Sequence, residues 1–495
     1  MEKLKTRPAP PYANCMFESL RGMNYSAATA IADVIDNSIT AEATKIDVEV
    51  RWSGSNSYIA IIDNGHGMTD ADLFKAMHLG NINPLSVRAP RDLGRFGFGL
   101  KTASLSQCRG LTVGSRTKAD PLAVLRWDLD FLAKQTEWLL LESPGEQASR
   151  IMESISDRQQ GTIVVWEKLD KIVTPGFTAD NFLDLVDNIK LHLSWVYHRF
   201  LQPSHPRLSL LLNGHPVKPA DPFMKTHPSA WHSPPDPIST PDGEVMVKAH
   251  ILPHKDKLSE KEFMDVSGPK GWTAHQGFHI FRNDRLLLSG GWLNLGSPKA
   301  WPQEEAYKLA RIELDIPNTA DAAWKLDIKK STATPPVMMR PQLLHLATTI
   351  RDRAKRVFVH KGEYTPDTEA KNITPVWNVS QNTSGPRYRI DRQHPAVQNI
   401  LSLGPDIQKE LLALLSLIET SVPVVRIWLD TTESSEKDEL PGASVPNDAM
   451  KQILSTVYRS MLNRGMSPQE ARNKLKKTEP FYDFPAIVDA LPDTP

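Results

Sequence analysis

Three short motifs of polar residues and glycines constrain this 495-residue chain more than any other feature. They read DVIDN at residues 33–37, DNGHGM at residues 63–68 and GRFGFGLKT at residues 94–102. Each motif alone is common in unrelated proteins. Their order is more informative, because a helix, a strand and a glycine-rich loop follow one another and bring polar groups and flexible backbone into one region of a fold.

The first motif is expected on a helix that Ser26 caps and that carries residues 27–38. Because residues i and i+4 share a helix face, Asp33 and Asn37 point towards one site. The amide oxygen of Asn37 is a hard, neutral ligand suited to Mg²⁺, and a carboxylate one turn away is placed to orient and deprotonate a water. The polar face of an ordinary amphipathic helix has the same spacing, so this motif alone does not identify a site.

The second motif follows an apolar strand at residues 58–62, so Asp63 stands at a strand end. A carboxylate there can accept a hydrogen bond from the amino group of adenine. Gly65 and Gly67 permit the backbone to approach a flat base closely. A plain Asp-Asn-Gly turn is the alternative interpretation.

In the third motif, glycines at 94, 97 and 99 permit backbone N–H groups to converge on phosphate oxygens, and Lys101 can add a point charge. The spacing differs from the Gly-x-Gly-x-x-Gly of dinucleotide-binding folds. It also lacks the Gly-Lys-Ser/Thr ending of a P-loop. By itself this glycine pattern is weak evidence.

Taken in order, with the Gly161-Thr162 strand after them, the motifs resemble the GHKL superfamily of ATPases over about residues 17–170. This superfamily includes type II topoisomerase ATPase subunits, the large heat-shock chaperone, histidine kinases and MutL. The sequence GFGLKTAS at residues 97–104 is most similar to the MORC-type branch. The resemblance implies an α+β fold that begins with a two-layer α/β sandwich ATPase domain.

The same resemblance implies a role for each motif residue, with ATP and Mg²⁺ as cofactors. Asn37 would be the Mg²⁺ ligand, Asp63 would read adenine with Thr162 helping through a bridging water, and residues 81–93 would form a lid. Asp33 stands where the family usually has a general-base glutamate, and its shorter side chain leaves the rate of hydrolysis open. The other expected ATP contacts are Ala41, Gly65, Gly67, Met68, Gly94, Phe96, Gly97, Gly99, Leu100 and Lys101.

The second domain is similar to the transducer of this superfamily, notably in QGFHIFRNDRL at residues 276–286. A transducer usually sends a lysine to the γ-phosphate. In DIKKS at residues 327–331 we choose Lys329 over Lys330 as the second catalytic residue. Two surface lysines after a strand are the alternative.

Four parts are expected along the chain: an N-terminal arm at residues 1–16, the ATPase domain at 17–190, a transducer-like α+β domain at 191–336 and a mostly helical region at 337–495. The tryptophans of the second domain are expected in its core rather than on a base-stacking platform. The basic run at residues 351–356 is interpreted as a solvated helix face, with nucleic-acid contact as the alternative.

Composition limits the partners. Lysine plus arginine equals aspartate plus glutamate at 58 each, so no global basic field favours nucleic acid. Two cysteines fit a reducing compartment and exclude a disulfide framework. No apolar leader and no stretch long enough for a membrane helix is present, so a cytoplasmic protein without membrane association is expected.

These observations favour an ATP-gated clamp that dimerises through its N-terminal domains when ATP binds. By analogy with bacterial relatives, DNA or a nuclease- or helicase-type effector is the expected partner, in DNA management or anti-phage defence. A nucleotide-sensing scaffold with little hydrolysis is the main alternative, because of Asp33. A chaperone-like ATPase, a histidine kinase and a topoisomerase fit the layout less well.

Overall fold

The computed structural model describes residues 12–22, 25–80, 93, 99–154, 159–204, 206–296, 298–320, 323–325, 332–359, 374, 376–382, 385–421, 448–481 and 484–492. The chain forms two compact units that divide between Tyr364 and Thr365. Within the first unit, two sheets each have a hydrophobic core of their own. We call the parts built on these sheets the first domain and the second domain.

The sheet of the first domain has the order β4-β3-β5-β2-β1-β6-β7. Neighbouring strands are antiparallel except β1 and β6, which run parallel. In β1, Ile46, Val48 and Val50 alternate into the core, as the period of two predicts. The strands are β1 (Lys45–Arg51), β2 (Tyr58–Asp63), β3 (Gly110–Arg116), β4 (Ala123–Asp128), β5 (Gly161–Glu167), β6 (Ser209–Leu212) and β7 (His215–Pro216).

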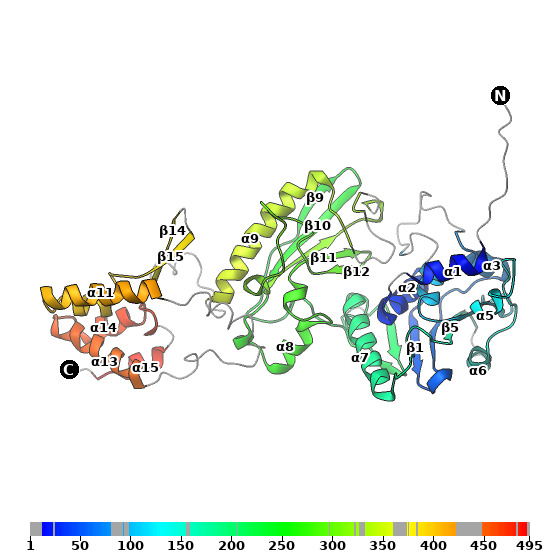
Figure 1. Ribbon diagram of the computed structural model, residues 1–495, viewed down its shortest axis with the longest axis horizontal. Helices are drawn as coiled ribbons and strands as arrows, with labels where there is room; N and C mark the ends of the chain where they lie inside the picture. The colour runs from blue at the N-terminus through cyan, green and yellow to red at the C-terminus, as the bar shows by residue number, and fades with distance from the viewer. Residues whose placement is uncertain are drawn as a thin grey trace, which may run out of the picture. The chain divides into compact units, whose positions relative to one another are not determined.

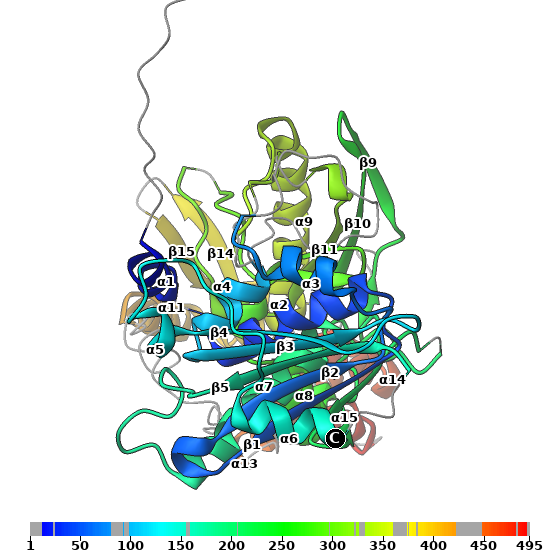
Figure 2. The ribbon, with the colours of Figure 1, turned by 90° about the vertical axis from the view of Figure 1, so that its right-hand side faces the viewer.

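Helices cover this sheet mainly on one side. Figure 2 shows α2, α3 and α4 on one face of the strands and α6 on the other, where Ile151 and Met152 meet Ile163. Helix α2 begins after Ser26, whose hydroxyl accepts a hydrogen bond from the N–H of Thr29, as expected for an N-cap. The helices are α1 (Ala13–Arg21), α2 (Ala27–Thr40), α3 (Asp70–Met77), α4 (Gly99–Leu105), α5 (Leu129–Leu132), α6 (Glu146–Ser154) and α7 (Ala179–Val196).

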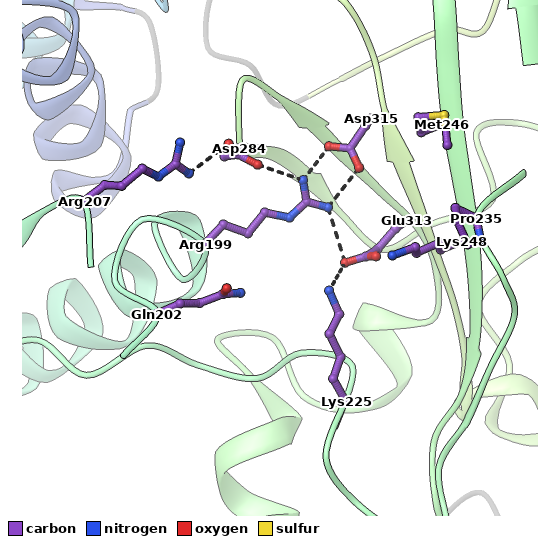
Figure 3. A pocket seen from close by; sticks show the side chains of 10 residues that line it. All are labelled: Arg199, Gln202, Arg207, Lys225, Pro235, Met246, Lys248, Asp284, Glu313 and Asp315. Carbon is purple, nitrogen blue, oxygen red and sulfur yellow. Dashed lines mark hydrogen bonds and ion pairs between the residues drawn. The ribbon is translucent and has the colours of Figure 1, made fainter. Parts of the chain in front are cut away.

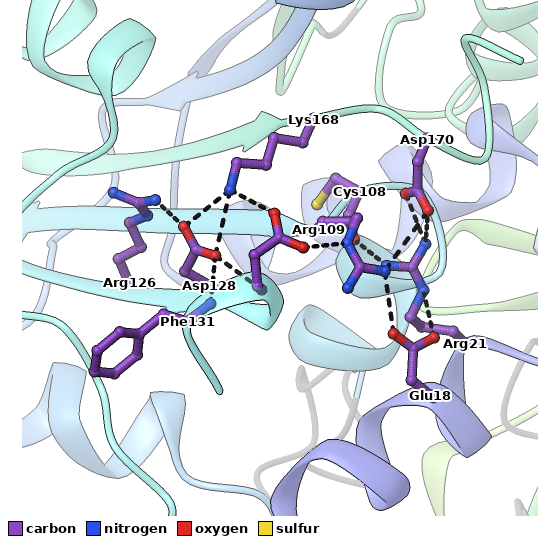
Figure 4. Close-up of polar contacts among 10 residues, drawn as sticks. Glu18, Arg21, Cys108, Arg109, Arg126, Asp128, Phe131, Lys168 and Asp170 are labelled. Atoms are coloured by element: carbon purple, nitrogen blue, oxygen red, sulfur yellow. Dashed lines mark hydrogen bonds and ion pairs between the residues drawn. The ribbon is translucent and has the colours of Figure 1, made fainter. Parts of the chain in front are cut away.

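An ion-pair cluster fastens α1 to the edge of this domain (Figure 4). Both carboxylate oxygens of Asp170 lie 2.6 Å from Nη2 of Arg21, whose Nη1 donates to the carbonyl oxygen of Cys108 at 3.2 Å. Arg109 joins Glu18 of α1, at 3.1 Å, to Asp130, at 2.7 Å. Since the Arg21 side chain is buried, losing its carboxylate partner would be more costly than losing an exposed pair.

The second domain is built on a sheet with the order β12-β11-β13-β10-β8, and β9 also pairs with β10. Its buried tryptophans, among them Trp272, Trp292 and Trp324, lie in the core. The core interpretation of this tryptophan cluster is therefore confirmed. The elements are β8 (Trp231–His232), β9 (Asp236–Thr240), β10 (Gly243–Ile251), α8 (Glu260–Ser267), β11 (Gly277–Arg282), β12 (Arg285–Ser289), β13 (Ala310–Asp315) and α9 (Arg340–Val359).

Helix α9 runs along the second sheet and supplies Leu343, Ala347 and Ile350 to its core (Figure 1). From the sequence we placed this helix in the C-terminal region and residues 209–216 in the second domain. By packing, α9 belongs with the second sheet, and β6 and β7 with the first. The basic run is only partly solvated, because Arg351 is buried and its guanidinium stacks over Tyr307 at 3.7 Å.

The second unit combines a hairpin with helices around a small core. A capping box is present at Ser467, since its hydroxyl accepts from the N–H of Glu470 and the Glu470 carboxylate accepts from the N–H of Ser467. Across the described part of both units, no helix is long and apolar enough to cross a membrane. The elements are β14 (Trp377–Asn382), β15 (Gly385–Ile390), α10 (Pro395–Leu401), α11 (Pro405–Ser421), α13 (Asp448–Asn463), α14 (Pro468–Leu475) and α15 (Pro485–Asp489).

Helix α7 offers a matched pair of leucines for a stability test. Leu193 is fully buried in the first core, whereas the side chain of Leu183 is 63% exposed. We expect Leu193→Ala to lower the free energy of unfolding by about 2–5 kcal/mol, because it removes buried methyl groups and leaves a cavity. Leu183→Ala should change it by less than about 0.5 kcal/mol. Urea denaturation followed by tryptophan fluorescence measures both, and equal losses would contradict this packing.

Candidate functional site

The centre of the candidate site is the carboxylate of Asp63, at the end of β2. Its Oδ1 accepts hydrogen bonds from the N–H groups of Gly65 at 2.9 Å and Thr162 at 3.1 Å, and its Oδ2 accepts from the hydroxyl of Ser38 at 2.7 Å. Burial raises the pKa of Asp63, and these three donors oppose that rise. Asp63 is thus fixed by three separate segments, with acceptor capacity left on Oδ2.

The turn after Asp63 packs so closely that it requires glycine. Gly67 has φ of 71°, and a Cβ there would lie 1.9 Å from the carbonyl oxygen of Arg116. A Cβ on Gly65 would lie 2.7 Å from the carbonyl oxygen of Ala41, at the end of α2. The glycines therefore let the turn fit between α2 and β3, which is a stricter demand than the approach to a base expected from the sequence.

The hydroxyl groups of Ser115 and Thr162 extend the hydrogen-bond network of Asp63 along the sheet. The N–H of Met68 donates to Oγ of Ser115 at 2.9 Å, and the hydroxyls of Ser115 and Thr162 lie 2.8 Å apart. Because the N–H of Thr162 binds Asp63, Met68 is linked to the carboxylate through these two residues. Six residues singled out from the sequence thus gather here: Ala41, Asp63, Gly65, Gly67, Met68 and Thr162.

Helix α2 carries the other two polar residues of the candidate site, Asn37 and Asp33. Asn37 is exposed, and its Nδ2 donates to the carbonyl oxygen of Asp33 at 3.2 Å. Its amide oxygen accepts no hydrogen bond within the described structure, so a neutral oxygen ligand is available there. This donor fits Mg²⁺, which takes oxygen ligands and keeps most of its coordination for phosphates and waters.

Asp33, one turn before Asn37, is buried. Its Oδ2 lies 3.2 Å from the hydroxyl of Tyr25, and its Oδ1 lies 3.4 Å from Nη2 of Arg285. Asp36 binds Arg285 more closely, through Nε at 2.8 and 2.9 Å, and also the hydroxyl of Tyr197 at 2.8 Å. Sequence reasoning gave no role to these partners, although Asp36 lies inside the first motif and Arg285 inside the segment at residues 276–286.

Only the end of the third motif belongs to the described chain. Gly99, Leu100 and Lys101 begin α4, which packs on α2. Lys101 is buried and its Nζ donates to the carbonyl oxygen of Ala76 at 2.8 Å, while burial lowers its pKa to about 8. Gly94, Phe96, Gly97, Lys329 and Lys330 lie outside the described residues, as does the expected lid apart from Leu93.

A separate cavity of about 450 Å³ lies where the end of α7 meets the second sheet (Figure 3). Its acidic residues are already paired: Arg199 contacts Asp284 and Glu313 at 3.3 Å and Asp315 at 3.0 Å, and Lys225 contacts Glu313 at 2.8 Å. The cavity shares no residue with the Asp63 and α2 groups. It lies at the joint between the two domains, because its lining comes in part from the segment after α7 and in part from the second sheet. Its lining is Arg199, Gln202, Arg207, Lys225, Pro235, Met246, Lys248, Asp284, Glu313 and Asp315.

The packing around Gly67 predicts a strong effect of one methyl group. Gly67→Ala would force the turn away from Arg116, so we expect a large loss of both stability and nucleotide affinity. Gly54 is the matched control, because it has φ of 56° but no atom lies within 4 Å of the place that a Cβ would take. Gly54→Ala should cost only about 1–2 kcal/mol, from its left-handed backbone. Calorimetric titration with ATP and thermal unfolding measure both effects, and similar behaviour of the two variants would contradict the close fit.

The buried ammonium of Lys101 predicts a pH dependence of stability. Its pKa is about 8 in the folded chain and near the ordinary lysine value when unfolded, so the unfolded state binds more protons between these values. This group therefore destabilises the fold below pH 8, and the loss is recovered as pH rises above it. Lys101→Met should stabilise the nucleotide-free protein more at pH 7 than at pH 10. Urea denaturation measures this difference, with the exposed Lys75→Met as the control for the loss of a lysine charge. An equal stabilisation by Lys101→Met at both pH values would contradict the burial of this ammonium.

Comparisons with known proteins agree with this geometry. The family model described as histidine kinase-, DNA gyrase B-, and HSP90-like ATPase matches residues 25–162. DNA mismatch repair protein MutL of Shewanella sediminis is 38% identical over 92 residues. DNA mismatch repair protein MLH1 of Saccharomyces cerevisiae is 32% identical over 132 residues, and PMS1 of Arabidopsis thaliana is 32% identical over 103 residues.

These matches are local. They cover 18%, 25% and 20% of this chain, and the chain spans only 15%, 16% and 11% of the length of the three relatives. The MORC-type subgroup stays a prediction. The family match extends from Tyr25 to Thr162 and so contains Asp33, Asn37 and Asp63. Residues 25–162 therefore belong to a domain of the GHKL ATPase superfamily, as the order of the motifs implied.

Proposed function

We propose that this chain is a Mg²⁺-dependent ATPase that acts as a molecular clamp. The observation that carries the proposal is the arrangement around α2 and β2. Asp63 is held by Ser38, Gly65 and Thr162 with an acceptor site left, while Asn37 offers a neutral oxygen from the adjoining helix. A buried carboxylate that can still accept one hydrogen bond can bind the amino group of a base. The oxygen that Asn37 presents on α2 can bind the cation that accompanies the phosphates.

Each residue then has a distinct task. Asp63 accepts a hydrogen bond from the adenine amino group, with Thr162 helping through a water, and Gly65, Gly67 and Met68 lie along the base. Asn37 would hold Mg²⁺, which when bound neutralises charge on the phosphates. Asp33 orients the attacking water and takes its proton. Lys101 and the glycine loop bind phosphate oxygens, and Lys329 completes the set from the second domain.

In this proposal, ATP closes the lid at residues 81–93 and joins the N-terminal domains of two chains into a homodimer in the cytoplasm. DNA is the proposed partner class, because the named relatives are DNA mismatch repair proteins. A nuclease- or helicase-type effector and a role in anti-phage defence rest on analogy with bacterial GHKL proteins.

A scaffold that senses nucleotide with little hydrolysis is the second candidate. Asp33 is shorter than the usual glutamate by one methylene. Its carboxylate also contacts Tyr25 and Arg285, so two partners compete with water for its oxygens. This pairing is the specific observation that favours slow turnover.

Hydrolysis separates the two candidates. We expect wild-type protein to release phosphate from Mg-ATP, and Asp33→Asn to bind ATP with similar affinity but to turn over about 10²–10⁴-fold more slowly, because the base is lost. Asp63→Asn should instead lose affinity. Phosphate release and calorimetric titration give both quantities. Equal, negligible turnover of wild type and Asp33→Asn with ATP bound would favour the scaffold.

The clamp also predicts a change of mass. A non-hydrolysable ATP analogue with Mg²⁺ should convert monomer into dimer, as measured by light scattering. Asp63→Asn, which is expected not to bind the analogue, is the control and should stay monomeric. An unchanged mass of the wild-type protein at saturating analogue would count against the clamp.

A further inference from the structure

Arg285 reaches from the second domain into the candidate site. It is the first residue of β12, it lies 249 residues after Asp36, and it is 4% exposed. Its Nε contacts both carboxylate oxygens of Asp36, at 2.9 and 2.8 Å, and its Nη2 lies 3.4 Å from Oδ1 of Asp33. One guanidinium therefore joins two carboxylates on neighbouring turns of α2.

Electrostatic attraction between Arg285 and the carboxylates of Asp33 and Asp36 holds this arrangement together. Two buried carboxylates three residues apart on a helix repel one another, and each needs a counter-ion or donors. Arg285 supplies the positive charge, because arginine stays protonated in proteins. The hydroxyls of Tyr25 and Tyr197 complete the cluster, and burial raises the pKa of Tyr197 so that it stays a neutral donor.

The two carboxylates are not held equally. Arg285 lies within hydrogen-bonding distance of Asp36, whereas its contact with Asp33 is longer. Asp36 therefore fixes the position of Arg285, and Arg285 in turn orients the side chain of Asp33. The same hairpin touches the end of the expected lid as well. Arg282, the last residue of β11, donates from Nη2 to the carbonyl oxygen of Leu93 at 2.5 Å.

We propose that Arg285 is a positioning residue for ATP hydrolysis and makes the chemical step in the first domain depend on the β11–β12 hairpin of the second. The inference rests on the proposed function, in which Asp33 is the base. Nucleotide binding centres on Asp63, whose partners Ser38, Gly65 and Thr162 all belong to the first domain. Hydrolysis therefore depends on Arg285, whereas the contacts of Asp63 that bind the base do not.

The test compares Arg285→Gln and Arg285→Lys in the full chain. In both variants we expect kcat to fall by about tenfold to a hundredfold, because small displacements of a reacting group are costly. The Kd for ATP should stay within about threefold of wild type, corresponding to about 0.65 kcal/mol. Lysine should not restore kcat, since a single ammonium lacks the fork that spans two carboxylates.

Arg207→Gln is the matched control. Arg207 pairs with Asp284 at 2.8 Å, one residue before Arg285 in the chain, but its side chain is half exposed. Its loss should leave kcat unchanged. Wild-type kcat, or a faster one, in Arg285→Gln would overturn the proposal, since the arginine would then be neutral or restrain the base.

A double variant distinguishes a loss of kcat caused by misfolding from one caused by the loss of Arg285 itself. Arg285→Gln removes the cation that pairs with Asp36, so the single variant can lose stability for that reason alone. Asp36→Asn combined with Arg285→Gln removes both charges of the tighter pair, and its circular dichroism and thermal unfolding report folding. A folded double variant with low kcat supports the positioning role, and one with wild-type kcat overturns it. Wild-type protein that binds ATP without turnover would defeat the proposed function itself, a result distinct from both.

Discussion

The buried pairing of Asp36 with Arg285 is the constraint on which the arrangement of the first unit depends. Asp36 is 1% exposed in the middle of α2, and a carboxylate there is tolerable only with a charge partner and donors. Its partner comes from β12 of the other domain. The position of the second sheet against α2 is therefore tied to the same helix that carries Asp33 and Asn37.

Much of the candidate site could be predicted from sequence because its signals are local. Asp33 and Asn37 follow from helical spacing, Asp63 from its place after an apolar strand, and Thr162 from the family pattern. Their proximity did not follow from any one motif but from the order of the motifs. Ser38 directly follows Asn37 in the sequence, yet no local feature of the sequence indicates that its hydroxyl lies 2.7 Å from the carboxylate of Asp63.

The partners that sequence reasoning missed are joined over long separations. Tyr197 lies 161 residues after Asp36, and Arg285 lies 249 residues after it. The sheet to which residues 209–216 belong was missed for the same reason, because the parallel pairing of β6 with β1 depends on the path of α7. The basic run at residues 351–356 was recognised as part of a helix, whereas the packing of α9 on the second sheet depends on which of its faces finds an apolar partner.

Of the arginines that cross the joint between the domains, Arg285 and Arg199 point in opposite directions and have unequal surroundings. Arg285 enters the first domain and meets carboxylates that are 5% exposed or less. Arg199, just after α7, enters the second domain and pairs with Asp284 and Asp315, whose side chains are 39% and 40% exposed. Water and salt screen those two pairs, so exchanging them costs little. Arg199 also contacts the buried Glu313 at 3.3 Å, but Glu313 would keep its contact with Lys225 at 2.8 Å if Arg199 moved away. Separating Asp36 from Arg285, by contrast, leaves buried charge behind. A rearrangement of the two sheets that preserves the Asp36 pair is therefore the least costly one, and it keeps the hairpin of β11 and β12 against the helix that carries Asp33.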